Sequence, residues 1–336
     1  MSDGVLRPLD TRRDLDTLVG LIEITFTDEL AHKGLDLRRE IRFVKRLMPI
    51  ILLLSKIFSE LRHLFDSFVW EENGHIVGMV TAQKMGNERA RWLIGTVATH
   101  PDYRRRGIAR QLVSRTLEHV RDNGAQFCVL DVRADNAPAY NLYRSMGFVH
   151  YDSTTKLKLE TLPQVQAQSA RGYSLRRMKL NEWPARYDLA KRATPPEVQA
   201  FLPVSEMEHR VSFVGRLITP LLLLLQRLRA YSWAVEKDGV LLGRMRLLAS
   251  HVEKRIHNLT LILDPAHHDH DALGEPLLTL ALQILQNHPP GNTVISVRAA
   301  QADLLNLLKR YGFAEIETTH RLGTKLGEVP RDKYRN

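Results

Sequence analysis

The stretch that decides the fold is Thr96–Ala109, which reads T-V-A-T-H-P-D-Y-R-R-R-G-I-A. Its first four residues are rich in β-branched side chains, which favour a strand. Pro101 ends that strand, because proline has no N–H to donate to a ladder. From Ile108 onward apolar residues recur with helical spacing. The sequence therefore predicts a strand, a short turn and a helix in succession.

The turn before this helix has the composition of an anion site. It carries Arg104, Arg105, Arg106 and Gly107. The first N–H groups of a helix have no intrahelical partner, and the helix dipole favours negative charge there. Glycine lets the backbone approach a ligand closely, since it has no Cβ. We predict a phosphate or pyrophosphate ligand; the alternative is a basic, solvated turn before an ordinary helix.

A second run, Asn136–Phe148, reads N-A-P-A-Y-N-L-Y-R-S-M-G-F. The two runs together resemble the GCN5-related N-acetyltransferase (GNAT) superfamily. Its pyrophosphate loop has Gln or Arg, then Gly three residues later and Gly or Ala two residues after that, which matches Arg104, Gly107 and Ala109. Its downstream pattern, Asn-x-x-Ala-x-x-Leu-Tyr-x-x-x-Gly-Phe, matches Asn136 to Phe148 without a gap.

This resemblance implies an α/β (α+β) fold of two tandem GNAT-type domains, each a mixed, mostly antiparallel sheet flanked by helices. It also implies transfer of an acetyl group from acetyl-CoA (coenzyme A) to an amine of a small molecule or peptide, without a metal. The strand at Val97–Thr99 is expected to splay from its neighbour and pair with the pantetheine arm, and the backbone of Arg105–Arg110 to hold the pyrophosphate. The implied cofactor-binding residues are Val97, Ala98, Thr99, Arg104, Arg105, Arg106, Gly107, Ile108, Ala109, Arg110, Asn136 and Tyr143.

Tyr143 is the implied catalytic residue, because many family members use a phenol at this position to protonate the leaving thiolate. The other interpretation is a core aromatic residue whose hydroxyl meets solvent. The general base is open, since Trp92–Thr96, before the loop, has no carboxylate. Asp131, His100 and a water chain are the candidates. The pocket for the acceptor is expected at residues 25–65, and the sequence does not identify the acceptor.

The chain contains an internal repeat. Phe43–Pro49 has a partner in Phe213–Pro220, and Trp70–Gly78 is echoed by Val235–Gly243. Further pairs are Val132–Ala134 with Val297–Ala299, and Asn141–Phe148 with Asn306–Phe313. The Asn73-Gly74 and Asp238-Gly239 dipeptides predict a hairpin in each half. We therefore predict an N-terminal GNAT domain at 1–160, a linker at 161–172 and a GNAT-like domain at 173–336.

The second copy of the phosphate loop is degenerate. It reads D-P-A-H-H-D-H-D-A-L-G-E-P over Asp264–Pro276, so the arginines are gone, acidic residues have arrived and Pro276 removes a donor N–H. Leu308 stands where Tyr143 stands in the first half. The histidines and aspartates of this run allow a metal site, but a solvated, eroded loop is favoured. Chemistry is thus expected in the first half alone.

Composition limits the remaining possibilities. The 336 residues are 44% hydrophobic and 26% charged, with a net charge of +10 and one cysteine, Cys128. A buried thiol, the lack of a disulfide framework and a start unlike a signal peptide predict a cytoplasmic protein. The apolar runs Leu47–Leu54 and Leu217–Leu225 are too short to span a membrane, and we expect both to be buried helix segments.

Three alternatives remain at this point. The positive charge is compatible with a nucleic-acid binder, but it serves a polyanionic cofactor equally well, and nucleic acid is not favoured. A non-catalytic acyl-CoA-binding or protein-interaction module would explain the missing base. The apolar helices leave a homodimer possible.

Overall fold

The computed structural model describes residues 4–10, 13–25, 66–85, 91–170, 172–179, 181–210 and 213–327. The chain divides into two compact units that are not consecutive halves of the sequence. The first comprises Met1–Val132, Pro138–His150 and Leu322–Asn336, and the second comprises Arg133–Ala137 and Tyr151–Arg321. The run Leu47–Leu54 and the predicted acceptor segment from residue 26 to 65 lie outside the described residues.

The first unit is built on a mixed sheet. Its strands follow in the order β1 (Val5–Pro8), β2 (Asp66–Glu72), β3 (His75–Met85), β4 (Arg91–Thr99) and β5 (Phe127–Arg133). The first three pairings are antiparallel, and β4 pairs with β5 in parallel. This is the predicted mixed, mostly antiparallel sheet.

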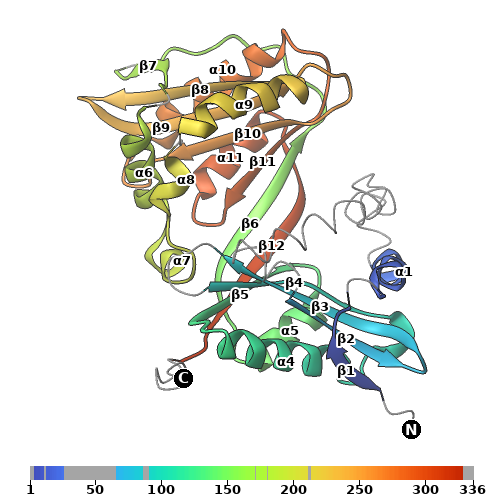
Figure 1. Ribbon diagram of the computed structural model, residues 1–336. Coiled ribbons are helices and arrows are strands. Elements are labelled where there is room, and N and C mark those ends of the chain that lie inside the picture. The colour runs from blue at the N-terminus through green and yellow to red at the C-terminus, as the bar shows by residue number, and fades with distance from the viewer. Residues whose placement is uncertain are drawn as a thin grey trace. The chain divides into compact units, whose positions relative to one another are not determined.

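Helices cover both faces of that sheet (Figure 1). One face packs against α4 (Ile108–Asp122) and α5 (Ala137–Ser145), and its core includes the fully buried Leu112 and Cys128. The other face packs against α1 (Leu15–Thr25) through Leu18 and Leu21. The buried thiol at Cys128 is as predicted.

The second unit repeats this plan. Its strands lie in the order β12, β6, β11, β10, β9, β8, β7. Their bounds are β6 Val149–Leu159, β7 Ser174–Arg177, β8 Leu228–Lys237, β9 Val240–Ser250, β10 His257–Leu263, β11 Thr293–Arg298 and β12 Ala314–Lys325. The main core lies between this sheet and the helices α10 (His270–Leu285) and α11 (Ala302–Arg310). The remaining helices are α6 Trp183–Arg192, α7 Pro196–Phe201, α8 Glu206–His209 and α9 Phe213–Leu225.

The two predicted hairpin turns are confirmed. Asn73 and Gly74 have φ of 52° and 77°, and Asp238 and Gly239 have φ of 51° and 77°. Two successive left-handed residues match the twist of the flanking strands, which is why Asn-Gly and Asp-Gly are favoured in two-residue loops. The first turn joins β2 to β3, and the second joins β8 to β9.

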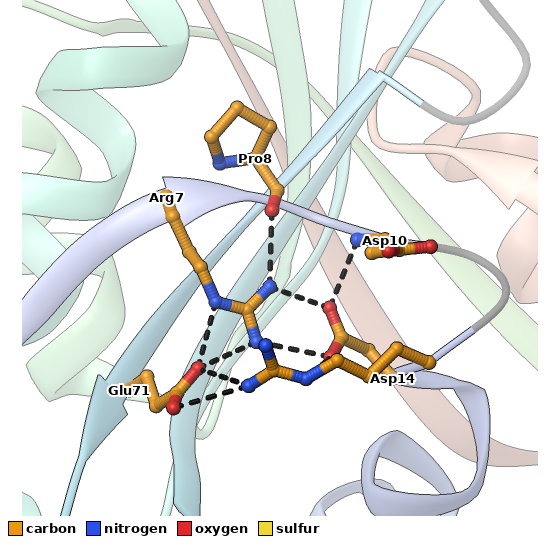
Figure 2. Close-up of polar contacts among 6 residues, drawn as sticks. Arg7, Pro8, Asp10, Asp14 and Glu71 are labelled. Carbon is orange, nitrogen blue, oxygen red and sulfur yellow. Dashed lines mark hydrogen bonds and ion pairs between the residues drawn. The ribbon is translucent and has the colours of Figure 1, made fainter. Parts of the chain in front are cut away.

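An ion cluster also recurs in both units, and Figure 2 shows the copy in the first. The guanidinium of Arg7, on β1, lies 2.6 Å from a carboxylate oxygen of Asp14 and 2.7 Å from one of Glu71. Asp14 also accepts a hydrogen bond from the backbone N–H of Asp10. These contacts tie the first strand to the start of α1 and to β2.

The copy in the second unit has the same design. Arg176, on β7, contacts Glu182 at 2.9 Å and Glu236 at 2.6 Å. Glu182 accepts from the backbone N–H of Lys179, as Asp14 does from Asp10. Glu71 and Glu236 lie within a sequence match that indicated the repeat, whereas the pairs Arg7 with Arg176 and Asp14 with Glu182 do not. These two further pairs add support for the duplication.

The closing strands explain why the units are not consecutive in sequence. Residues 154–159 of β6 pair with β11, inside the second unit. The end of β12 belongs to the first unit, where Leu322 is fully buried in the core and the N–H of Leu326 donates to the carbonyl of Gln126. The predicted domains at 1–160 and 173–336 stay predictions.

The prediction that Leu217–Leu225 is a buried helix segment is half wrong. The run is helical, as part of α9. However, Ile218, Leu221, Leu222, Leu224 and Leu225 are 45–72% exposed. Pro220 lies inside this helix, and an apolar composition alone does not bury a helix. Within the part of the chain that the structure describes, no helix has both the length and the apolar character needed to cross a bilayer.

Candidate functional site

The turn between β4 and α4 has the geometry that the sequence predicts. A short 3₁₀ helix, Pro101–Tyr103, follows β4, and Arg105 and Gly107 have left-handed φ of 61° and 80°. Gly107 is the N-cap of α4 and offers no side chain to the helix. Its left-handed conformation is one that glycine adopts without a steric penalty.

The N-terminus of α4 is open to a ligand. The first intrahelical bond at this end runs from the N–H of Gln111 to the carbonyl of Gly107. The N–H groups of Ile108, Ala109 and Arg110 precede it and so have no partner within the helix. A Cβ built on Gly107 would meet no heavy atom within 4 Å. Free donors, a favourable dipole and open space are what a phosphate group requires.

The arginine side chains of this loop differ in their partners. The guanidinium of Arg106 donates to the buried carboxylate of Glu72 at 3.0 Å and stacks 5.0 Å above the ring of Tyr103. Arg110 donates to the hydroxyl of Ser145 at 2.6 Å. Arg104 makes a longer contact, 3.4 Å, to the carbonyl of Thr99, and Arg105 is exposed.

These contacts change which groups of the loop we expect to bind a phosphate. Arg106 and Arg110 fix the loop to β2 and α5, so the backbone N–H groups are the donors that face a ligand. Sequence reasoning missed Glu72 and Ser145, because both partners come from other elements and no local pattern marks them.

Strand β4 carries a bulge at the point where it leaves β5. Val97 pairs with Val80 and Ile94 with Ala82, so Gly95 and Thr96 together oppose Thr81. The hydroxyl of Thr81 accepts the N–H of Thr96 at 2.9 Å. A Cβ on Gly95 would lie 2.6 Å from that hydroxyl oxygen, which explains the glycine. Bulges bend a strand and interrupt its pairing.

The pairing of β4 with β5 stops at this bulge. Its last register pair is Ile94 with Leu130, while β4 continues to pair with β3 as far as Thr99. The N–H of His100 donates to Val77 on β3, so by alternation the N–H groups of Val97 and Thr99 point to the other edge. Ala98 is buried against α1, on the face opposite the loop helix. The strand is thus splayed, and its free edge offers backbone groups to an extended ligand.

Tyr143 is the buried residue of α5. It is 6% exposed and packs in the core beside Phe148, with ring centroids 6.0 Å apart. Burial raises the pKa of its phenol to about 12. The hydroxyl therefore keeps its proton at neutral pH, which is the form that a general acid needs. The same burial also fits a core aromatic residue, so the position does not decide the role.

The other predicted residues fall as follows. Asn136 precedes α5, donates its backbone N–H to the carbonyl of Arg133 and belongs to the second unit. The ring of His100 accepts the N–H of Asp102 at 3.3 Å and so caps the 3₁₀ turn. Asp131 is an exposed residue of β5. The general base stays open.

The prediction of a solvated loop in the second unit is confirmed for residues 264–269, which are non-helical and mostly exposed, but residues 270–276 are the first part of a helix. Helix α10 begins at His270, before Gly274, whereas α4 begins after Gly107. The carboxylate of Asp269 caps α10 by accepting the N–H of Ala272 at 2.9 Å. Pro276 is buried in the helix interior and is not among the terminal donors.

The histidines of this region have protein partners. His267 lies 2.7 Å from the hydroxyl of Tyr173, and His270 lies 2.6 Å from a carboxylate oxygen of Asp303. Asp264 is bound by Arg192 at 2.8 Å. Across the described ranges, no three His, Cys, Asp or Glu side chains are placed to hold a metal ion.

Comparisons with known proteins agree with this geometry. Residues 33–148 match the Acetyltransferase (GNAT) family. An acetyltransferase of Sodalis glossinidius is 34% identical over 102 residues, which cover 30% of this chain and 70% of that protein. The ribosomal protein bS18-alanine N-acetyltransferase of Escherichia coli is 32% identical over 82 residues, or 24% of this chain and 53% of that protein. A mycothiol acetyltransferase of Thermobifida fusca is 42% identical over 57 residues, which cover 17% of this chain and 18% of that protein. The chain thus spans about half of the second relative and less than a fifth of the third.

Solved structures resemble the chain over nearly its full length. A GCN5-related N-acetyltransferase from Sphaerobacter thermophilus has a TM-score of 0.60 at 12% identity and covers 97% of each chain. A tandem GNAT protein from the clavulanic acid biosynthesis pathway has a TM-score of 0.54 at 16% identity, covering 98% of this chain and 100% of that one. At these identities the likeness shows the fold alone.

Proposed function

Because this chain belongs to the GNAT family of acetyltransferases, we propose that it transfers an acetyl group from acetyl-CoA to an amine, with the chemistry in its first unit. The observation that carries this proposal is the combination of an open helix N-terminus at Gly107 with a splayed β4. The open helix N-terminus fits a pyrophosphate, and the splayed strand fits an extended arm that contains amides. The second unit lacks the open helix end.

The residues of the first unit fit acetyl-CoA in a defined way. The N–H groups of Ile108, Ala109 and Arg110 would hold its pyrophosphate, and Gly107 would let the backbone come close. The free edge of β4 at Val97 and Thr99 would pair with the pantetheine amides. The role of Asn136 stays a prediction. Bound acetyl-CoA supplies an activated acetyl thioester, and the strand orients that group for the amine.

Tyr143 is the residue that we propose to assist the departing sulfur. Its phenol, with a pKa of about 12, is protonated at all physiological pH values. That pKa lies roughly 3 units or more above the ~8.5 of an ordinary thiol. Complete transfer of the proton is therefore uphill, so Tyr143 Oη would act mainly as a hydrogen-bond donor to the developing thiolate.

The acceptor is proposed only as a class, an amine of a small molecule or a peptide. One relative's name specifies an alanine of a ribosomal protein, and another's specifies mycothiol. A screen should accordingly contain both Ala-starting peptides and small amines. Since no carboxylate stands in Trp92–Thr96, amines that are already deprotonated near neutral pH are the better first choice.

The test is a calorimetric titration of acetyl-CoA into the full chain. We expect one site per chain, followed by acetyl transfer to at least one amine in the screen. Two sites would contradict the assignment of binding to the first unit alone. Binding without transfer to any acceptor would favour a non-catalytic acyl-CoA-binding module, and absence of binding would overturn the proposal.

A further inference from the structure

The two units bury corresponding faces of their sheets under α1 and α6, but with different side chains. In the first unit this face is apolar, formed by Leu18, Leu21, Val69, Ile76, Met79 and Ala98. The repeated ion cluster aligns Asp14 with Glu182, which places Arg186 opposite Leu18. The repeated turn aligns Gly74 with Gly239, which places Arg244 opposite Met79. Two arginines thus replace two buried apolar residues.

Arg244 lies in the middle of the second sheet, under α6. Its register partners are Ala234 on β8 and Ile262 on β10, and both pack with Leu189 of α6. Arg246, two residues further along β9, is on the same face and is exposed to solvent. On this face Arg246 therefore lies at the solvent-exposed end, and Arg244 lies nearer the covered centre of the strand.

Arg244 and Arg246 have no ion-pair partner among the described residues of the unit. The Nε atom of Arg244 is buried and has no hydrogen-bond partner. Burial, and then the charges of Arg186 and Arg246, lower the pKa of the Arg244 guanidinium to about 10.

Arg186 adds a third charge from above. It is 9% exposed and donates to the carbonyl of His209 at 2.8 Å. The carboxylate that acts on it, Glu182, is already held by Arg176 and by the N–H of Lys179. The charge of Arg186 in turn acts on Arg244, whose buried Nε has no hydrogen-bond partner, so a bound anion would offset the lost hydration of Arg244.

We propose that Arg186, Arg244 and Arg246 form a binding site for an oxyanion, the carboxylate or phosphate group of a small molecule. The planar guanidinium offers paired donors that match both groups. Packing does not require these arginines, because the first unit fills the same face with Leu18 and Met79. The site is independent of acetyl transfer in the first unit.

Calorimetric titration of the full chain with inorganic phosphate, and separately with acetate, tests this site at constant ionic strength set by sodium chloride. The variants Arg244→Met and Arg246→Thr introduce the residues that the first unit has at these positions. Arg310→Met is the control, because Arg310 is an exposed arginine paired with Asp271 on another part of the unit. We expect saturable binding in wild type and control, and at least a tenfold loss of affinity in both test variants.

Thermal unfolding gives a second, independent readout. Without added anion, Arg244→Met should melt at a higher temperature than wild type, because it removes a half-buried guanidinium whose buried Nε has no hydrogen-bond partner. Saturating phosphate or acetate should raise the wild-type melting temperature by about 3 °C and leave the variant unchanged. A response to phosphate alone would identify a phosphate site, and one to acetate alone a carboxylate site. If Arg244→Met melted lower and neither anion bound, the arginine would be structural and the proposal would be wrong.

Discussion

Helices α4 and α10 are counterparts in the two units, yet their N-termini have opposite chemistry. At α4 a left-handed glycine leaves the first N–H groups open and leaves space in front of them. At α10 the helix starts earlier, and the Asp269 carboxylate occupies the position that a ligand phosphate would take. One duplicated framework thus carries the proposed anion site in one copy and a self-capped helix in the other.

This comparison shows that a helix N-terminus without an open anion-binding end can be the more stable one locally. An N-cap carboxylate satisfies an orphan N–H and interacts favourably with the helix dipole. The open end of α4 forgoes that stabilisation and keeps its donors for a ligand. The following changes test this contrast, beginning with the largest expected effect.

Gly107→Glu should abolish acetyl-CoA binding, with a loss of affinity of about 100-fold or more. A side chain at φ 80° is strained, and a carboxylate at this point repels the pyrophosphate. Gly124→Glu is a matched control, because Gly124 also has a left-handed φ, 78°, and open space, but at the other end of α4. Calorimetry on both variants measures the effect, and equal losses would mean that strain alone is responsible.

Tyr143→Phe should lower kcat by roughly 100-fold while acetyl-CoA still binds, since general acid catalysis contributes on this order. The measurement is steady-state transfer to the acceptor found in the screen. Tyr140→Phe, one turn earlier on the same helix and half-buried, is the control. An unchanged kcat in Tyr143→Phe would leave this residue as a core residue only, like its counterpart Leu308 in the second unit.

The first unit should lose stability earlier than the second as the pH rises. Burial raises the pKa of the Cys128 thiol to about 12, from an ordinary 9.0. Above pH 9 the unfolded chain releases this proton and the folded chain keeps it, so the free energy of unfolding falls between pH 9 and pH 12. In the second unit burial also raises the pKa of Tyr311 to about 12, but from 10.0, so its decline begins later.

Urea unfolding of wild type and Cys128→Ala between pH 7.5 and pH 11 measures this effect. Above pH 9 the wild type should lose about 1 kcal/mol more per pH unit than the variant does. Parallel pH profiles for the two proteins would show that the thiol does not carry the effect.

Asp269→Ala should lower the free energy of unfolding by about 1 kcal/mol, as expected for loss of an N-cap. It should not create a second acetyl-CoA site, because the surrounding helix start and the absence of the arginines remain. Asp271→Ala, in the first turn of the same helix, should cost less, since its partner Arg310 is an exposed residue. Differential scanning calorimetry measures the loss of stability in each variant. Titration with acetyl-CoA tests for a second site, and finding one in Asp269→Ala would contradict the proposed difference between the N-termini of α4 and α10.

Local chemistry made much of this structure predictable from the sequence. The turns at Asn73 and Asp238 require left-handed residues, and the loop at Gly107 requires glycine before a helix. Each of these constraints acts within a few residues, so the pattern reveals it directly. The resemblance to a family then predicted the fold, which is confirmed, and the cofactor, which stays a proposal.

What the sequence did not reveal depends on contacts between distant residues. Arg106 meets Glu72, Thr81 supports the bulge at Thr96, and Arg186 comes to share a face with Arg244. The exposure of Leu224 on α9 is similar, because an apolar helix is buried only if the tertiary structure provides a partner. Helix α10 also takes up residues 270–276 of the predicted loop, because Asp269 caps it at that point.

The placement of β12 has a consequence for how the chain is made. Leu322 and Leu326 belong to the core of the first unit, although more than 160 residues of sequence separate them from the end of β6 at Leu159. At a translation rate of 5–20 residues per second, the ribosome needs on the order of 10 to 30 s to synthesise that interval. Throughout this time the nascent first unit lacks the side chains that close its core. Its apolar surface is then available to chaperones, and its folding can finish only after nearly all of the second unit has emerged.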